Sequence, residues 1–335
     1  MLHPMLGLKR RLLVAALGAA PALPHGALGQ PPARSYRVGV LVGAGSDARD
    51  YAFAALRAGL RDLGFVEGHN LALDQRVDLE GTEASLAQAA GELAALEPDV
   101  VVAANTPPVM AMRQAAPRTP IVMVATGDPV GAGLVQSLAR PGGTVTGLSA
   151  PDVEHTAKRL ELLAQVVPGV RRVGLLASPD NPLFALQLRN AEAAARARGI
   201  ELLREEVTGP SQLDRAFQSI VERKGTAVMR LGGFRSREAV KRLAELAAQH
   251  RLPFCTDRLL EVEQGLLMSY GPNIAATFRQ AAGVVVAILK GANPAELPVV
   301  PAGRIDLAVN MKTARALGIV FPAAVRARAN AVVDS

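Results

Sequence analysis

Short apolar strand patterns alternate with helical patterns along most of the chain, and this alternation limits the possible folds more than any other feature. Runs rich in β-branched and apolar residues occur at 37–42, 71–77, 100–103 and 121–125, with apolar residues at helical spacing between them. Strands that alternate with helices form βαβ units, in which neighbouring strands are parallel and helices cover both faces of the sheet. The sequence therefore predicts an α/β fold with a doubly wound parallel sheet.

The same alternation restarts after Gly147. Strands are predicted at 172–177, 201–206, 227–231 and 253–256, with helices at 182–198, 212–224 and 235–250. The halves also share short sequences: residues 39–42 (GVLV) correspond to 174–177 (GLLA), and residues 118–121 (RTPI) to 251–254 (RLPF). A chain of 335 residues exceeds the size of one ordinary core. We therefore expect two similar doubly wound lobes.

The C-terminal part departs from this alternation. An apolar stripe from Phe278 to Leu289 predicts a helix, and a proline-rich stretch then leads to a strand at 304–310. If the helix packs on the first lobe and the strand joins the second, the chain crosses between the lobes three times and forms a multi-strand hinge. A cleft is then expected at the carboxyl edges of the sheets. The expected division is an N-terminal lobe of residues 36–148 plus 273–300 and a C-terminal lobe of residues 149–272 plus 301–335.

The N-terminus has the order of a secretory signal peptide. A basic cluster at residues 9–11 precedes an apolar run over 12–23, and residues 27–29 (ALG) supply the small side chains that a signal peptidase requires. The run is shorter than the roughly 20 residues that span a bilayer. We expect residues 1–29 to be removed and the mature protein to be periplasmic. An inner-membrane anchor and twin-arginine export stay as alternatives.

Charge and cysteine content argue against several classes of protein. The formal net charge is +7, and three of the cations lie in the leader. No basic block, zinc-finger spacing or RNA-binding motif is present, so we expect no nucleic-acid partner. Cys255 is the only cysteine, so no intrachain disulfide can form and no cysteine follows the leader to carry a lipid. No histidine pair has zinc-ligand spacing, and neither a metal nor a cofactor is expected.

Two motifs resemble those of other classes of protein, but each motif is incomplete. Residues 43–48 (GAGSDA) match the dinucleotide fingerprint G-x-G-x-x-A, but Asp74 and Asp78 only loosely supply its acidic residue. Residues 147–151 (GLSAP) resemble a nucleophile elbow and lack its final glycine. A dinucleotide-binding protein and a periplasmic enzyme remain alternatives. If neither alternative holds, residues in both motifs would contribute to a ligand cleft.

Small polar residues recur directly after the predicted strands. Each alone fits a helix cap as well as a ligand contact. Together they lie where open α/β sheets bind ligands. Free helix amides there would hold a carboxylate, whereas Asp128 or Asp257 would hold an ammonium group, and these are the two charged groups of an amino acid. The candidate ligand-binding residues are Ser46, Asn105, Thr106, Thr126, Asp128, Ser149, Ser178, Asn181 and Asp257.

Several longer runs resemble the ABC-transporter substrate-binding proteins related to the tryptophan and tyrosine importers. The runs are 60–71 (LRDLGFVEGHNL), 98–102 (PDVVV), 127–135 (GDPVGAGLV), 139–147 (ARPGGTVTG), 266–272 (LLMSYGP) and 305–318. The resemblance implies a type I periplasmic-binding fold, a small-molecule ligand without chemistry, and delivery of that ligand to an ABC permease in the inner membrane. It also implies a pocket role for Asn105, Thr106 and Asp128. We expect a monomer.

The sequence departs from that family at two positions and in one feature. Thr144 and Ser178 stand where the family often has asparagine, and the cysteine of lipid-anchored relatives is missing. Because Ser178 follows a strand at the expected cleft, the resemblance does not imply an aromatic ligand. A ligand-sensing module for a membrane receptor would have the same sequence and differ only in its partner. A transcriptional regulator of this fold would need a helix-turn-helix where the leader stands.

Overall fold

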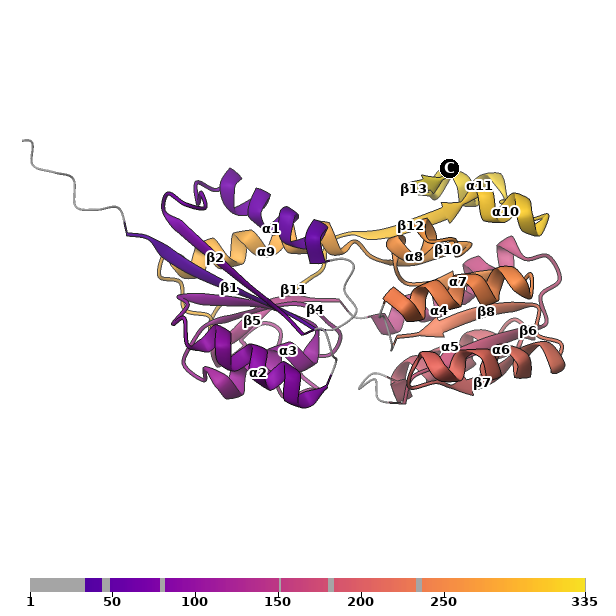
Figure 1. Ribbon diagram of the computed structural model, residues 1–335, viewed down its shortest axis with the longest axis horizontal. Helices are drawn as coiled ribbons and strands as arrows, with labels where there is room; N and C mark the ends of the chain where they lie inside the picture. Colours follow the sequence, from indigo (N-terminus) through magenta and orange to yellow (C-terminus); the bar gives the residue numbers. More distant parts are fainter. Residues whose placement is uncertain are drawn as a thin grey trace, which may run out of the picture. The chain divides into compact units, whose positions relative to one another are not determined.

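The alternating patterns form two separate sheets, each covered by helices on both faces (Figure 1). The computed structural model describes residues 34–43, 49–78, 82–150, 152–179, 184–232 and 237–334. The predicted signal peptide, Ser46 and Asn181 lie outside these residues. Within the described ranges, no helix combines the length and the apolar character that a membrane span requires.

The first sheet, here called sheet A, consists of parallel strands, of which the central ones are buried on both faces. Its helices are amphipathic: α1 and α9 cover one face, and α2 and α3 cover the other. Its strands and helices are β1 (Tyr36–Val42), β2 (Leu71–Val77), β3 (Val100–Ala104), β4 (Ile121–Thr126), β5 (Val145–Ser149) and β11 (Val300–Pro301), with α1 (Arg49–Asp62), α2 (Glu83–Ala94), α3 (Thr106–Ala115) and α9 (Ile274–Leu289).

The second sheet, sheet B, is parallel except where β10 pairs with β12. Helices α4 and α5 pack on one face, and α6 and α7 pack on the other. Its elements are β6 (Arg172–Ala177), β7 (Glu201–Glu206), β8 (Ala227–Leu231), β9 (Phe254–Thr256), β10 (Met268–Pro272), β12 (Ile305–Asn310) and β13 (Ala331–Val333), with α4 (Asp152–Val166), α5 (Phe184–Arg196), α6 (Leu213–Glu222), α7 (Arg237–Gln249), α8 (Leu259–Glu263), α10 (Met311–Leu317), α11 (Ala323–Arg328) and the 3₁₀ turn η1 (Pro210–Gln212).

The two sheets repeat one strand order. Sheet A runs β11-β5-β4-β3-β1-β2, and sheet B runs β13-β12-β10-β9-β8-β6-β7. In sheet A, β2 lies on one side of β1, and β3, β4 and β5 lie on the other. In sheet B, β7 lies on one side of β6, and β8, β9 and β10 lie on the other. The sequence similarities noted above involve β1 and β6, and the residues that lead into β4 and β9, which are equivalent positions. The order in which strands are added to the sheet therefore reverses between β1 and β3 and between β6 and β8, and such sheets bind ligands at this point.

Strands β5 and β10 were not predicted from the sequence. Their segments, VTGLS and MSYGP, contain glycine and proline, which are rare inside strands. Gly147 has φ of +130°, and a Cβ there would lie 2.3 Å from the backbone oxygen of Met123. Glycine is therefore required by a close approach of β5 to β4. Helix α4 was also missed.

The chain passes between the two sheets three times. The connections join β5 to α4, β10 to α9 and β11 to β12. Asn273 ends the second connection and caps α9, because its Oδ1 accepts from the Ala276 amide at 2.7 Å while its Nδ2 donates to Asp306 at 2.6 Å. The amide of Ala302 donates to the Ser149 carbonyl at 2.7 Å. The connecting segments are thus bonded to one another rather than free.

Candidate functional site

Five of the predicted site residues lie at the carboxyl edge of sheet A. Strand β4 pairs with β3 on one side and β5 on the other, and Thr126 is the register partner of Ser149. The Asn105 amide donates to the Val124 carbonyl at 2.9 Å, so the segment after β3 stays attached to β4. The structure therefore brings together the ends of three neighbouring strands: Asn105, Thr106, Thr126, Asp128 and Ser149.

Asn105 has a strained backbone and an uncommitted side chain. Its φ is 70° and its ψ is 170°, a region that non-glycine residues rarely occupy, and such conformations cost about 1–3 kcal/mol. The residue stands at the N-cap position of α3, yet its side chain makes no capping hydrogen bond and is exposed. The helix-cap explanation therefore does not account for this asparagine. Thr106 is the first residue of α3.

Thr126 places a hydroxyl group in an apolar environment. The residue is fully buried, and its Oγ1 has no hydrogen-bond partner among the described residues. The strand is irregular there, because Ala125 has φ of 56° and the register with β5 shifts between Met123 and Thr126. The neighbouring Ser149 hydroxyl makes only a long contact of 3.5 Å with the Gly127 carbonyl. Both hydroxyls thus retain hydrogen-bonding capacity.

Asp128 closes a turn within its own segment. Its Oδ1 accepts from the Gly131 amide at 2.8 Å, and a Cβ at residue 131 would lie 2.2 Å from the other carboxylate oxygen. Glycine at 131 therefore makes room for the carboxylate. Of the two acids predicted to hold an ammonium group, this one has a local structural function of its own. Its ligand-binding role stays a prediction.

At the carboxyl edge of sheet B, the two described candidates are not adjacent. Ser178 follows β6 and Asp257 follows β9, and β8 lies between these strands. Both side chains are buried. Between them, β8 contributes Arg230, which sequence reasoning did not identify.

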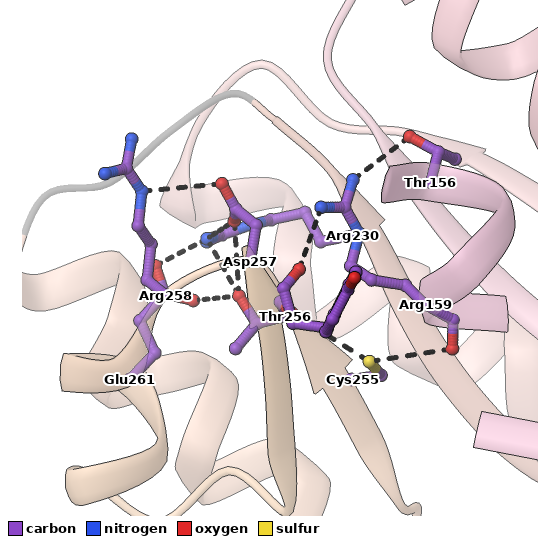
Figure 2. A network of polar contacts seen from close by, with 9 residues as sticks. Thr156, Arg159, Arg230, Cys255, Thr256, Asp257, Arg258 and Glu261 are labelled. Carbon is purple, nitrogen blue, oxygen red and sulfur yellow. Dashed lines mark hydrogen bonds and ion pairs between the residues drawn. The ribbon is translucent and has the colours of Figure 1, made fainter. Parts of the chain in front are cut away.

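Arg230 is fully buried and is the centre of a polar network (Figure 2). Its Nη2 donates to Glu261 at 2.5 Å, to Thr256 at 3.3 Å and to Asp257 at 3.4 Å. Arg258 approaches the other oxygen of Asp257 at 3.4 Å. Asp257, predicted to hold the ammonium group of a ligand, is therefore ion-paired within the protein, and its ligand-binding role stays a prediction.

A second buried guanidinium lies beside this network. Arg159, on α4, donates to the Thr156 hydroxyl at 3.1 Å and to the Tyr270 carbonyl at 3.3 Å. The thiol of Cys255 lies 3.9 Å from the Arg159 carbonyl oxygen. Burial raises the pKa of Cys255 to about 12, so the thiol stays protonated and unreactive at neutral pH.

One sequence signal would have pointed to the network. The run at 227–231 is AVMRL, in which a single arginine interrupts an otherwise apolar buried strand. Arginine is almost never fully buried unless it is paired. An acidic partner was therefore to be expected, although nothing in the sequence identifies Glu261 as that partner.

Other features of the described residues do not make a competing site. No group of three histidine, cysteine, aspartate or glutamate side chains in these ranges is arranged to hold a metal ion. A cavity of about 820 Å³ lies between α7 and α10, away from both carboxyl edges. Two of its polar side chains are bonded to backbone: Asn310 donates to the Val262 carbonyl and Thr313 to the Gly265 carbonyl, both at 2.8 Å.

Known proteins share both the sequence pattern and the fold. The family model "ABC transporter substrate binding protein" matches residues 37–333. A conserved domain protein from Vibrio cholerae is 31% identical, with a TM-score of 0.80 over 89% of this chain and 100% of that one. An ABC domain in complex with L-Trp from Streptococcus pneumoniae is 25% identical, also with a TM-score of 0.80 and the same coverage.

A curated relative is similar over much of its length. The tyrosine-binding protein of Clostridioides difficile is 24% identical over 258 residues, which are 77% of this chain and 74% of that protein. The structural matches confirm the predicted type I periplasmic-binding fold. The chain belongs to the family of ABC transporter substrate-binding proteins, and it is a binding protein and not an enzyme.

Proposed function

We propose that the protein captures an amino acid, or a similar small zwitterion, in the periplasm and delivers it to an ABC permease in the inner membrane. The ligand would lie between the carboxyl edges of sheets A and B. The two lobes would be residues 36–148 plus 273–300 and residues 149–272 plus 301–335. Relatives named for tyrosine and for bound L-Trp support an amino-acid ligand.

The observation that carries the proposal is the polar edge of sheet A. A buried Thr126 hydroxyl without a partner among the described residues stands next to a strained, exposed Asn105. Unmade hydrogen bonds and backbone strain both cost free energy, and functional sites are where such costs persist. A ligand that bonds to these groups would offset them.

The two charged groups of the ligand would bind at different edges. Backbone amides at the start of α3, near Thr106, suit a carboxylate, because the first amides of a helix have no partner within the helix. Asp257 suits the ammonium group, since its carboxylate is buried and a charge-assisted bond is strong in a poorly screened environment. Ser178 stands at the carboxyl edge of sheet B, and it does not determine which side chain the amino-acid ligand carries.

Binding would couple to closure about the three connections between the sheets. Affinity then depends on how far the ligand shifts the balance between open and closed forms. A micromolar ligand needs about 8 kcal/mol in total. A few charge-assisted bonds and apolar burial supply this after the ordering costs are met.

The direct test is a ligand screen on residues 30–335. Thermal unfolding would be followed with L-amino acids, their D-enantiomers, small carboxylates, sugars and nucleosides. A ligand at a hundredfold excess over its Kd adds about 2.7 kcal/mol of stability, so an L-amino acid should raise the Tm. Asn105→Ala should reduce the shift by about half or more, whereas Asn293→Ala, a change in an exposed turn, should leave it unchanged. Stabilisation by sugars alone would contradict the proposal.

The location is testable independently. With its first 29 residues, the full chain should appear in the periplasmic fraction as a shortened product. Recovery of the unshortened chain from the inner membrane would contradict export as a free protein.

A further inference from the structure

Asp306 is a buried carboxylate of sheet B that binds two of the segments connecting the sheets. It lies on β12, where its register partner is Gly271 on β10. Its Oδ1 accepts a hydrogen bond from the Arg304 Nε at 2.7 Å, and its Oδ2 accepts one from the Asn273 Nδ2 at 2.6 Å. One oxygen is therefore bonded to the segment that comes from β11, and the other to the segment that leads into α9.

Asn273 joins Asp306 to a helix that packs on the other sheet. Its Oδ1 accepts from the Ala276 amide, and its backbone carbonyl accepts from the Thr277 hydroxyl, both at 2.7 Å. The first turn of α9 therefore sets the position of this asparagine. Helix α9 is buried against α1 and against the strands of sheet A. The bond between Asn273 and Asp306 thus links an element of sheet A directly to a strand of sheet B.

Asn273 is attached at two points to the segment that enters β12. Its backbone amide donates to the Arg304 carbonyl at 2.9 Å, and its side-chain amide donates to Asp306, two residues farther along. A single hydrogen bond allows one segment to rotate against the other about that bond. A second bond at a separate residue removes this rotation, because both bonds require near-linear geometry. The side-chain bond therefore fixes the direction in which α9 leaves β10.

We propose that the hydrogen bond between Asn273 and Asp306 holds the two lobes in a narrow range of orientations before ligand binds. Both residues are positioning residues, and the inference rests on the proposed function, in which the lobes close on an amino acid. Without the bond, the ligand-free protein samples a wider range of orientations. Closure then restricts more conformational freedom, and the affinity falls. Both oxygens of Asp306 already accept bonds from the protein, so the loss is the same for every ligand.

The test exchanges the two side chains. Asn273→Asp keeps an oxygen that can cap α9 but places a second carboxylate against Asp306. Asp306→Asn brings an NH₂ group against either the Asn273 amide or the Arg304 guanidinium, so one hydrogen bond is lost. In the double variant the amide at 306 can donate to the carboxylate at 273, while its oxygen still accepts from Arg304. Each bond is then formed again with the two groups reversed.

Titration calorimetry with L-tyrosine and L-tryptophan gives the first readout. Each single variant should raise the Kd about fivefold or more, by the same factor for both ligands, because a bond to a charged group is lost away from the ligand. The double variant should return the Kd to within about twofold of the wild type. A wild-type Kd in both single variants, or no recovery in the double variant, overturns the inference. Unequal factors for the two ligands indicate a direct ligand contact and also overturn it.

Thr277→Val is the matched control for a merely structural effect. It removes a hydrogen bond to the Asn273 carbonyl within the same helical turn and keeps the bond between Asn273 and Asp306. The Tm of this variant should fall, since a buried hydroxyl loses its bond, whereas the Kd should stay at the wild-type value. An equal rise of the Kd in Thr277→Val would show that loss of stability alone weakens binding, and the inference then fails.

A measurement without ligand separates this inference from the proposed function. Spin labels would be attached through Ala87→Cys on α2 and Ala193→Cys on α5, which are exposed positions, whereas the native Cys255 is buried. Pulsed electron paramagnetic resonance should give a wider distribution of label distances in Asn273→Asp than in the wild type, and the wild-type width in the double variant. Equal widths overturn the inference. If the wild type binds neither amino acid, the amino-acid proposal fails, and the widths still decide whether this bond holds the lobes.

Discussion

The carboxyl edges of the two sheets are built on different principles. At sheet A the unusual feature is the backbone, with positive φ at Asn105 and Ala125, and the one charged candidate, Asp128, bonds within its own turn. At sheet B the residue that corresponds to Asn105 is Gly232, for which a φ of 54° costs little, and the unusual feature is charge, with Arg230 and Glu261 paired in the interior. Under the proposed function, sheet A would therefore recognise a ligand through a strained backbone and unmade hydrogen bonds, and sheet B through its buried ionic groups.

The largest expected effect comes from removing the charge at sheet B. Arg230→Met leaves two buried carboxylates without their shared guanidinium, and breaking such a pair costs about 3–5 kcal/mol. Urea denaturation should show this loss. The matched control is Arg172→Met on the adjacent strand, where the pair with Glu201 is exposed, and there we expect a loss below about 1 kcal/mol. Equal losses in the two variants would contradict the account of sheet B.

Two glycines give the second comparison. At Gly271 a Cβ would lie 2.2 Å from the backbone oxygen of Asp257, and at Gly131 it would lie 2.2 Å from the side-chain oxygen of Asp128. A side chain can move aside and a backbone cannot. Gly271→Ala should therefore lose about 3 kcal/mol or more of stability, and Gly131→Ala about 1 kcal/mol, in the same denaturation experiment. The reverse order would show that the turn at Asp128 is more rigid than its geometry indicates.

Relief of strain at sheet A should have the opposite sign. Asn105→Gly suits a φ of 70° and should increase the free energy of unfolding by about 1 kcal/mol. The same change removes the side-chain amide and should weaken ligand binding. The control is Asn293→Gly, in an exposed turn where φ is not positive, so that no backbone strain is relieved. A destabilised Asn105→Gly variant would mean that the asparagine has a structural function.

The smallest expected effect is at Thr126. Replacing a buried hydroxyl that lacks a partner among the described residues by the methyl group of valine should change stability by less than about 1 kcal/mol, with stabilisation favoured. Calorimetry should nevertheless show weaker ligand binding. Unchanged affinity would remove Thr126 from the site and leave sheet A with Asn105 and the α3 amides.

Most of the fold could be predicted because short strand patterns alternate regularly with helical patterns. The predicted bounds of β2, β6, β7 and β8 agree with the structure residue for residue. Strand β5 and strand β10 escaped prediction because a close strand approach requires glycine where the pattern expects a branched side chain. The sequence of a strand does not show which backbone segment will pack against that strand.

The two edges also differ in how far sequence could describe them. At sheet A, four of the five candidates follow two consecutive predicted strands, so the pattern places them together without knowledge of any contact. The fifth, Ser149, ends β5, which was not predicted. The contact between Arg230 and Glu261 joins residues 31 positions apart, and only the fold shows it. The sequence could suggest that the buried Arg230 needs an acidic partner. It could not show that Asp257, which immediately follows β9, lies farther from Arg230 than Glu261 does.

The account's central claim is that one ligand is held by both edges. Titration calorimetry of L-tyrosine and L-tryptophan with the wild type, Asn105→Ala and Asp257→Asn tests this most directly. The account predicts that each variant, one at sheet A and one at sheet B, weakens binding of the same amino acid at least about tenfold, or about 1.4 kcal/mol. If only one of the two variants alters the Kd, the ligand is bound by a single sheet edge and the claim is wrong.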